Sequence, residues 1–174
     1  MNLYLMRHAE AIPVGTNSRG EIIARDADRP LSPVGETGAA LIGKALKRID
    51  STVGLILTSP LVRAVQTGDI VKHTLDGRGA MRTTTNLSPG FTSEKLVDEI
   101  LSVNDGKNIV AIGHQPDMSM CISYLIAGSG SATVAMEPGA VACIKVTPRG
   151  RRAESQLLWL LTPAVAAILD SQPR

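Results

Sequence analysis

The chain has 174 residues, 44% of them hydrophobic, and its 18 basic and 16 acidic side chains give a formal charge of +2. Length and composition predict one domain, residues 1–174, with a well-buried core, because no Pro/Gly/Ser-rich linker divides the chain. The balanced charge argues against a nucleic-acid partner, although the sequence pI of 8.7 allows an anionic substrate. The N-terminus lacks the pattern of a signal peptide and no apolar run approaches the roughly 20 residues that span a bilayer, so we expect a cytoplasmic protein without a membrane partner.

The first predicted element is a buried strand over the apolar run Leu3 to Met6, which ends abruptly on Arg7 and His8. An arginine is costly in a buried strand unless an anion lies close by. The end of this strand is therefore the first place to look for chemistry. Residues 13–30, which follow, are polar and rich in Gly, Asp and Arg without clear periodicity, and they predict a long surface loop.

Helices and strands then alternate to the end of the chain. Ser32 predicts an N-cap and Pro33 the first position of a helix that runs to about Ile49. The apolar residues expected on its inner face are Leu41, Ala45, Leu46 and Ile49. The other expected elements are strands at 53–58, near 81–83, 108–112, 139–146 and 155–161, and helices from 60 to about 75, at 92–103, 117–127 and 163–169. This alternation predicts an α/β sandwich with a mainly parallel sheet, to which the last two strands, joined by a turn at 148–152, can add an antiparallel edge.

Two side-chain types receive a structural interpretation. Cys121 and Cys143 form neither a CxxC motif nor a Cys/His cluster with metal-ligand spacing, so we expect buried free thiols rather than a disulfide or a metal site. His73 lies in a predicted helix without a partner motif and is interpreted as a surface residue.

Three predicted strands are each followed by side chains that suit anion binding. Arg7 and His8 end the first strand, Arg63 follows Ser59 and Pro60 beyond the second, and His114 follows the strand at 108–112. Ligands of open α/β sheets bind in the crevice outside the carboxyl ends of the strands. We therefore expect two imidazoles and two guanidiniums to form one positive pocket that binds phosphate.

Histidines among arginines also suit phosphoryl transfer through a covalent intermediate. A neutral imidazole with one ring nitrogen fixed by a hydrogen bond keeps the other nitrogen free as a nucleophile, and His8 fits that role. Arg7, Arg63 and His114 would then stabilise the oxygens of the transferring group. Taken singly, His114 also fits a core or helix-cap histidine, and Arg63 a solvated residue of a helix.

Four segments together resemble the histidine phosphatase superfamily, also called phosphoglycerate mutase-like, and within it the SixA-type phosphohistidine phosphatases. The segments are MRHAE at 6–10, RPLSPVG at 29–35, TSPLVRAVQT at 58–67 and IGHQP at 112–116. The resemblance implies a three-layer α/β/α fold. It also implies that His8 is the nucleophile that becomes phosphorylated, that Arg7, Arg63 and His114 bind the phosphoryl group, and that no metal or organic cofactor takes part.

The chain departs from the superfamily at one position. Many members carry a Glu or Asp after the third strand as the proton donor to the leaving group, and the nearest match here is Asn86, which cannot donate that proton. Glu10, Asp26, Asp28 and Glu94 are other carboxylates that could approach from the loops, but for each we favour a solvated or capping role.

The missing carboxylate favours one class of substrate. An alcohol leaves poorly without protonation, for which general acids supply roughly 10²- to 10⁴-fold, whereas an imidazole leaving a P–N bond is less demanding. We therefore expect a phosphatase that acts on phosphohistidine in a protein. One alternative is a phosphatase of small phosphomonoesters, such as a sugar phosphate, a nucleotide or a ribazole phosphate. The other is a non-catalytic module that binds phosphate or a phosphoprotein. The sequence does not predict the oligomeric state.

Overall fold

The computed structural model describes residues 1–16, 20, 22–50, 52–103, 105–129, 131–149 and 152–171. The main sheet contains the strands β1 (Asn2–Arg7), β4 (Val53–Thr58), β5 (Ala80–Thr83), β6 (Asn108–Gly113), β7 (Val141–Arg149) and β8 (Arg152–Leu161). The α-helices of the described residues are α1 (Pro33–Ile49), α2 (Val62–Thr74), α3 (Ser93–Val103), α4 (Asp117–Ala127) and α5 (Pro163–Asp170). Each of these elements overlaps a predicted one.

The order of the strands in the main sheet is β5-β4-β6-β1-β7-β8. The first four strands in that order pair in parallel, whereas β7 runs antiparallel to β1 and β8 antiparallel to β7. This confirms the expected mainly parallel sheet with an antiparallel edge. Ile112 near the end of β6 pairs with Met6 of β1 on one side and with Thr58 of β4 on the other. The carboxyl ends of these three strands therefore lie side by side.

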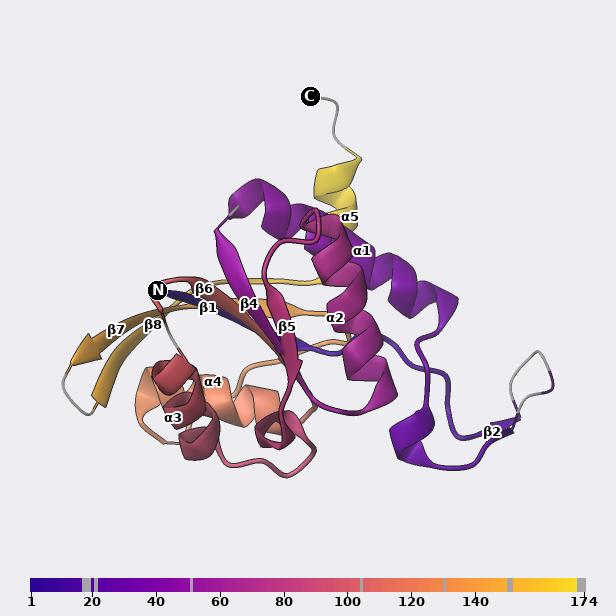
Figure 1. Cartoon of the computed structure of the whole chain (residues 1–174), viewed down its shortest axis with the longest axis horizontal. Coiled ribbons are helices and arrows are strands. Elements are labelled where there is room, and N and C mark those ends of the chain that lie inside the picture. Colours follow the sequence, from indigo (N-terminus) through magenta and orange to yellow (C-terminus); the bar gives the residue numbers. More distant parts are fainter. Residues whose placement is uncertain are drawn as a thin grey trace.

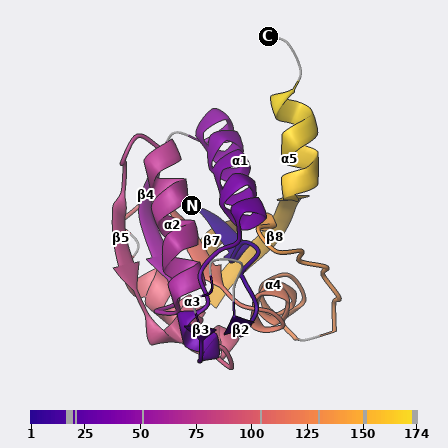
Figure 2. The ribbon, with the colours of Figure 1, turned by 90° about the vertical axis from the view of Figure 1, so that its right-hand side faces the viewer.

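Helices cover both faces of the sheet, which confirms the three-layer α/β/α fold (Figures 1 and 2). Leu3 and Leu5 of β1 pack with residues of α3 and α4, whereas Tyr4 and Met6 pack with residues of α1, α2 and α5. Alternate residues of a strand point to opposite faces of the sheet, so a strand covered on both faces is apolar throughout. The short run at residues 3–6 is apolar for this reason.

The N-terminus of α1 forms as the sequence predicts. The Oγ of Ser32 accepts a hydrogen bond from the backbone N–H of Gly35 at 3.0 Å, and Pro33 occupies the first turn. The buried face of the helix differs from the prediction. Leu46 is buried as expected, but Ile49 is 54% exposed, and Ile42 is buried instead.

Glycines explain this shift in the buried face of α1. The face includes Gly35, Gly38 and Gly43, which a search for large apolar residues does not count. A Cβ at Gly43 would collide with the side chain of Thr74, so α2 approaches α1 closely there. Small residues therefore form part of the buried face, and Leu41 and Ala45 lie at the margin of the core.

Residues 13–30 contain more structure than the expected loop. Strands β2 (Gly15–Thr16) and β3 (Ile22–Ile23) form a small antiparallel pair that extends away from the sheet, and the 3₁₀ helix η1 (Asp26–Asp28) follows (Figure 1). A second 3₁₀ helix, η2 (Thr85–Leu87), follows β5. The segment 13–30 lacks periodicity because much of its order comes from contacts between side chains and the backbone, which leave no regular apolar pattern. Residues 17–19 and 21 lie outside the described residues.

Three smaller predictions can also be compared with the structure. Cys121 and Cys143 are free and buried, in core clusters on opposite faces of the sheet, as expected. His73 is exposed on α2, also as expected. Residues 150 and 151, in the turn predicted between the last two strands, lie outside the described residues.

No helix within the described residues is both long and apolar enough to cross a membrane.

Candidate active site

The four predicted site residues come together at the aligned ends of three strands. Arg7 ends β1 and His8 follows it, Arg63 lies in the first turn of α2 after β4, and His114 follows β6 directly. The backbone N–H of His8 donates to the carbonyl of Gly113 at 3.0 Å, which fixes the end of β1 against the end of β6. Convergence on one place therefore follows from the parallel register of the central strands.

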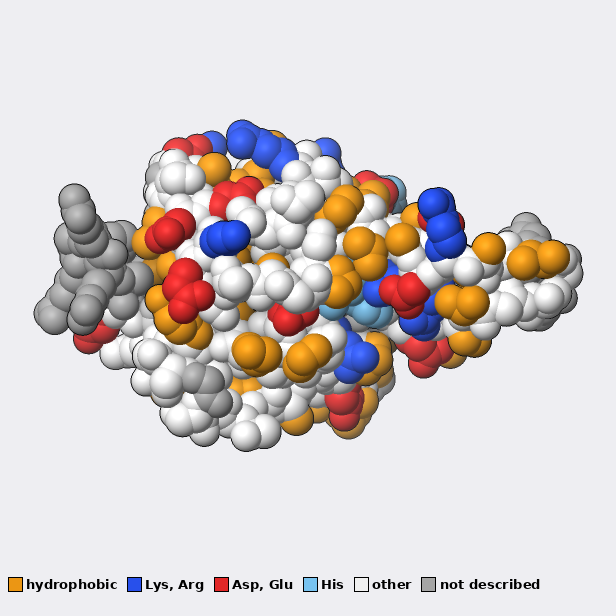
Figure 3. Space-filling model, turned by 90° about the horizontal axis from the view of Figure 1, so that it is seen from below, with side chains coloured by type: hydrophobic (Ala, Val, Ile, Leu, Met, Phe, Trp, Pro, Cys, Tyr) orange, Lys and Arg blue, Asp and Glu red, His pale blue; other side chains and the backbone are white. Residues whose placement is uncertain are grey.

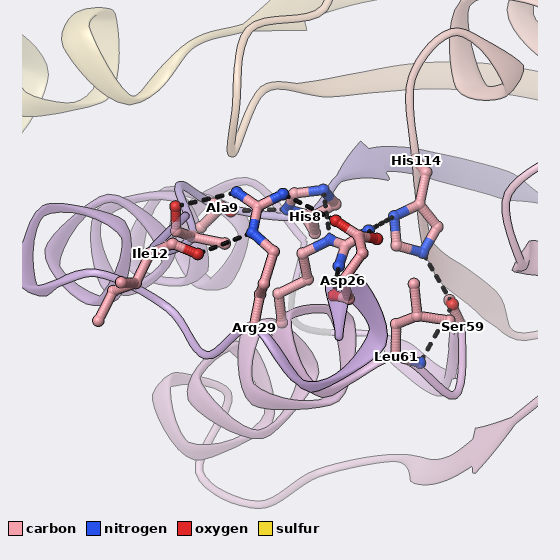
Figure 4. A network of polar contacts seen from close by, with 10 residues as sticks. His8, Ala9, Ile12, Asp26, Arg29, Ser59, Leu61 and His114 are labelled. Carbon is pink, nitrogen blue, oxygen red and sulfur yellow. Dashed lines mark hydrogen bonds and ion pairs between the residues drawn. The ribbon is translucent and has the colours of Figure 1, made fainter. Parts of the chain in front are cut away.

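Arg63 is the centre of this cluster. Its Nε donates to Nε2 of His8 at 3.1 Å, and its Nη2 lies 3.4 Å from Nδ1 of His114 (Figure 4). The two imidazole rings have centroids 4.9 Å apart and are tilted by 57°. Arg63 is only 4% exposed, so the alternative of a solvated helix arginine is wrong.

Arg7 supplies the second guanidinium. Its Nη1 donates to the carbonyl of Met136 at 2.8 Å. Its Nε is buried and has no hydrogen-bond partner among the described residues. A buried donor without a partner is unfavourable unless a bound group accepts from it, and an anion in the pocket is such a group.

His8 is oriented by its neighbour in the chain. Its Nδ1 lies 2.7 Å from the carbonyl of Ala9, which can only accept, so Nδ1 carries the hydrogen. Nε2 then keeps a lone pair and accepts from Arg63. Burial, with the nearby positive charges of Arg63 and Arg7, lowers the pKa of His8 to about 4. The ring is therefore neutral near pH 7, with the state of Nε2 that a nucleophile requires.

His114 is held by a buried hydroxyl. Its Nε2 lies 2.8 Å from the Oγ of Ser59, which is fully buried. Burial, together with the neighbouring His8 and Arg63, lowers the pKa of His114 to about 3. Because the Ser59 hydroxyl can donate or accept, it can pair with either neutral tautomer of His114. Nδ1 can thus accept from Arg63 in one tautomer and donate to an anion in the other. Sequence reasoning did not assign Ser59 this contact.

Two residues of the 13–30 segment complete the pocket, and Asp26, which is exposed as expected, also pairs with Arg63, which the sequence did not predict. Arg63 donates from Nη1 to the backbone carbonyl of Asp26 at 2.6 Å and from Nη2 to its Oδ2 at 2.9 Å. Arg29 donates to Oδ1 of the same carboxylate at 3.0 Å. The i,i+3 spacing of Asp26 and Arg29 in the sequence could have indicated their pairing, but not the contact with Arg63.

Among the described contacts, the other candidate carboxylates do not pair with Arg63, although Glu10 also lines the pocket. Glu10 accepts a hydrogen bond from the Oγ of Ser32 at 2.7 Å, and the Oδ2 of Asp28 lies 2.6 Å from Nε of Arg25. Glu94 is exposed in the first turn of α3. These three fit the solvated or capping roles that were expected.

Asn86 does not reach into the pocket. Its Nδ2 donates to Oε2 of Glu99 at 2.7 Å, and the Thr84 hydroxyl donates to the same oxygen at 2.8 Å. Neither Asn86 nor Glu99 lines the pocket. The position expected to carry a proton donor therefore has neither the chemistry nor the location for it in this chain.

The pocket has a volume of about 410 Å³ and is open at the surface. Histidine and basic side chains gather in the hollow, with apolar side chains beside it (Figure 3). The lining residues are Arg7, His8, Glu10, Ala11, Asp26, Arg29, Arg63, Pro89, His114, Gln115 and Pro138. Three arginines and two histidines face two carboxylates, so the pocket is suited to an anion. Within the described part of the chain, no group of three His, Cys, Asp or Glu side chains could hold a metal ion.

Comparisons with known proteins agree with this chemistry. The sequence profile of the histidine phosphatase superfamily (branch 1) matches residues 3–88. An uncharacterized protein of the cyanobacterium Picosynechococcus is 35% identical over 121 residues, which cover 68% of each chain.

Solved structures share the fold across nearly the whole chain. The protein histidine phosphatase SixA complexed with tungstate aligns with a TM-score of 0.79 and 22% identity over 94% of this chain and 98% of that one. A mycobacterial glucosyl-3-phosphoglycerate phosphatase aligns with a TM-score of 0.68 and 15% identity over 91% and 97% of the two chains. Structures with such different substrates share this architecture, so the fold alone does not select a substrate.

Proposed function

Because the chain belongs to the histidine phosphatase superfamily, we propose that it removes the phosphoryl group from phosphohistidine in a protein, through a covalent intermediate on His8. Family membership supports phosphatase activity, and the identity of the substrate is the further step. One observation carries the proposal. His8 holds its hydrogen on Nδ1 against the carbonyl of Ala9, so Nε2 keeps the lone pair that attack requires. Beside it, Arg63 and the Nε of Arg7, which has no partner among the described residues, can hold an anion.

In the first step, Nε2 of His8 attacks phosphorus while the P–N bond of the substrate breaks. The electron pair of the breaking bond stays on the leaving nitrogen, and the phosphoryl group moves in line between the two imidazoles. Arg7, Arg63 and His114 donate hydrogen bonds to its oxygens and stabilise their charge in the transition state. The carbonyl of Ala9 stabilises the positive charge that His8 acquires when its Nε2 binds phosphorus.

In the second step, water attacks the phosphohistidine from the side that the leaving group has vacated. The bond between phosphorus and Nε2 breaks, and its electron pair returns to the ring. His8 becomes neutral again with its hydrogen still on Nδ1. Phosphate leaves with the oxygen of water and one of its protons, and the second proton passes to another phosphate oxygen or to solvent.

Two features of the site support a phosphoprotein as the substrate. The pocket is open at the surface, so a phosphorylated side chain on a protein can enter it. Asn86 is turned to Glu99 and supplies no acid, and an imidazole can leave without a strong proton donor at that place. The match to the protein histidine phosphatase SixA, although it concerns the fold, agrees with this choice.

Rapid-quench trapping tests the covalent step. The wild-type protein is mixed with a protein that carries ³²P-phosphohistidine and is quenched in alkali within milliseconds. We expect acid-labile label on the wild-type chain and no label on His8→Ala, with turnover lowered by roughly 10⁴-fold or more. His73→Ala, which removes an exposed histidine of α2, is the matched control and should keep both label and turnover. Hydrolysis by His8→Ala at the wild-type rate would refute a nucleophilic role.

A substrate panel tests the substrate class. We expect kcat/KM for a phosphohistidine protein to exceed the values for sugar phosphates and nucleotides. A higher kcat/KM for a small phosphomonoester would instead favour the alternative phosphatase. An absence of hydrolysis of every substrate, combined with phosphate binding, would favour the non-catalytic binding module.

A further inference from the structure

The carboxylate of Asp26 occupies the hydrogen-bonding positions on Arg63 that a phosphoryl group needs. Nη2 of Arg63 lies 2.9 Å from Oδ2 of Asp26, and Nη1 donates to the backbone carbonyl of the same residue at 2.6 Å. The Arg63 side chain is 5% exposed, whereas that of Asp26 is 58% exposed. In this ion pair, the arginine belongs to the packed floor of the pocket and the aspartate is the partner that can move.

A phosphoryl group can displace this carboxylate. It offers more charge and more acceptor oxygens than a carboxylate, and it is also held by Arg7 and His114. The two anions repel each other, so both cannot share the guanidinium of Arg63 at close range. Binding of the substrate therefore separates Asp26 from Arg63.

Arg29 keeps the displaced carboxylate at the mouth of the pocket. Nη1 of Arg29 lies 3.0 Å from Oδ1 of Asp26. The same guanidinium donates from Nε to the carbonyl of Ile12 at 2.7 Å and from Nη2 to that of Ala11 at 3.2 Å. Arg29 is thus anchored to the backbone, and Asp26 can leave Arg63 without leaving the site.

In-line transfer places the leaving group on the side of phosphorus opposite His8. His8 is partly buried, whereas the side chain of Asp26 is 58% exposed, so the leaving group lies toward the open side of the pocket, which Asp26 and Arg29 also line. The group that departs from phosphohistidine is an imidazole ring. It leaves most easily when its distal nitrogen carries a proton, because it then departs as neutral imidazole rather than as an anion.

We propose that Asp26 gives up Arg63 to the phosphoryl group and accepts the distal N–H of the leaving imidazolium, so that it selects phosphohistidine over phosphate esters. This inference rests on the proposed function and names the residue that confers its specificity. The distal proton stays on the leaving ring throughout. The electron pair of the broken P–N bond neutralises that ring, and Asp26 remains a carboxylate.

The charge state of Asp26 agrees with this role. Arg29 and Arg63 hold the pKa of its carboxyl below the ordinary value, despite a smaller opposing contribution from burial. An ionised carboxylate stabilises a cationic ring, but it cannot protonate the oxygen of an ester. It also repels a leaving group that departs as an anion.

The variant Asp26→Asn tests this inference with two substrates that have different leaving groups. We expect the substitution to change kcat/KM in opposite directions for the two. For free phosphohistidine, we expect kcat/KM to fall by roughly 10- to 100-fold, the size of a lost charge-assisted hydrogen bond. For p-nitrophenyl phosphate, whose phenolate leaves unprotonated, we expect kcat/KM to rise several-fold, because the variant removes both the competitor for Arg63 and the repulsion. Inhibition by inorganic phosphate should strengthen for the same reason.

Asp28→Asn is the matched control, since Asp28 lies on the same 3₁₀ helix but pairs with the exposed Arg25. This variant should leave kcat/KM unchanged for both substrates. Equal losses on both substrates in Asp26→Asn, or no loss on phosphohistidine, would overturn the inference while the proposed function stands. A wild-type protein that cleaves p-nitrophenyl phosphate but not phosphohistidine would instead refute the proposed substrate, and the role of Asp26 with it.

Discussion

The floor and the rim of the pocket are built in different ways. The floor residues, which are Arg7, His8, Arg63 and His114, lie at strand ends or in the first turn of a helix, and each contacts backbone or buried groups. The rim residues Asp26 and Arg29 lie in a segment outside the main sheet. Asp26 is exposed, and among the described residues its carboxylate is held by the charged side chains of Arg29 and Arg63.

This difference separates the chemistry from the selection of the substrate. Packed strands keep the floor atoms in place, so the geometry of attack does not depend on the segment that covers it. The rim is joined to the floor mainly through the contact between Asp26 and Arg63, which an anion can replace. A change in the rim should therefore alter which leaving group is accepted, while a change in the floor should affect every substrate.

Arg63→Lys should lower kcat/KM more than the other changes, because it alters the floor and also the contact between Arg63 and Asp26 of the rim. A lysine cannot reproduce the fork that reaches His8 and two acceptors of Asp26, nor bind phosphate in the same geometry. We expect kcat/KM to fall by roughly 10²- to 10³-fold on phosphohistidine and on p-nitrophenyl phosphate alike. Arg25→Lys, at an exposed position that does not line the pocket, should leave both values unchanged. Loss on one substrate only would contradict the assignment of Arg63 to the floor.

The floor and the rim should affect activity and stability at different pH values, because their side chains ionise in different ranges. Because burial lowers the pKa of His8 to about 4, the acid limb of kcat/KM should lie near pH 4 rather than near 6.5. Unfolded histidine binds a proton below about 6.5, so the unfolded state binds more protons than the native state between these values. The free energy of unfolding should therefore fall as the pH drops from 6.5 toward 4.

The controls for this pH effect are His8→Gln and His114→Gln, each of which should flatten the decline in stability above pH 4. Asp26 affects stability in a different pH range, because the pKa of its carboxyl is lowered. The stability that it contributes is present above the ordinary carboxyl value and is lost as the pH falls below it. Denaturant titrations at several pH values measure both, and an acid limb near pH 6.5 would contradict a neutral, buried His8.

Two glycines of α1 test how closely this helix packs on the segment that follows β1. A Cβ at Gly35 would collide with the carbonyl of Glu10, whereas one at Gly38 would meet Pro163 at an ordinary 3.5 Å. We expect Gly35→Ala to lower the free energy of unfolding by about 1–3 kcal/mol, as overpacking does. Gly38→Ala, the control in the same helix, should raise it by up to about 1 kcal/mol, because alanine favours helix. Equal effects of the two changes in urea titrations would show that the contact with Glu10 does not constrain the packing of α1.

Ser59→Ala should have the smallest effect on catalysis. It removes the hydroxyl that holds Nε2 of His114, without changing any group that contacts phosphate directly. We expect kcat/KM to fall by about 3- to 10-fold on both substrates, near the value of one neutral hydrogen bond. Ser102→Ala, at an exposed position of α3, should change nothing. A steeper loss on one substrate would place Ser59 with the selection of the leaving group rather than with the floor.

The sequence was most informative where local patterns repeat. Ser32 and Pro33 predicted the start of α1, and the apolar run at residues 3–6 predicted a central strand. The buried face of α1 was misjudged because glycines, rather than large apolar residues, form its close contacts. The segment 13–30 was misjudged because side-chain contacts with the backbone give it order without periodicity.

The candidate site also contains a part that the sequence predicted and a part that it did not. The sequence by itself determined which residues could form the floor, because anion-binding side chains that follow parallel strands share one edge of the sheet. It could not place Asp26, since nothing in the spacing of residues 13–30 indicates the direction in which that segment turns. Only the tertiary structure brought its carboxylate to Arg63, 37 positions away in the chain. Strand register is set by local patterns and backbone pairing, whereas the path of an irregular segment is set by contacts that form only once the rest of the chain has folded.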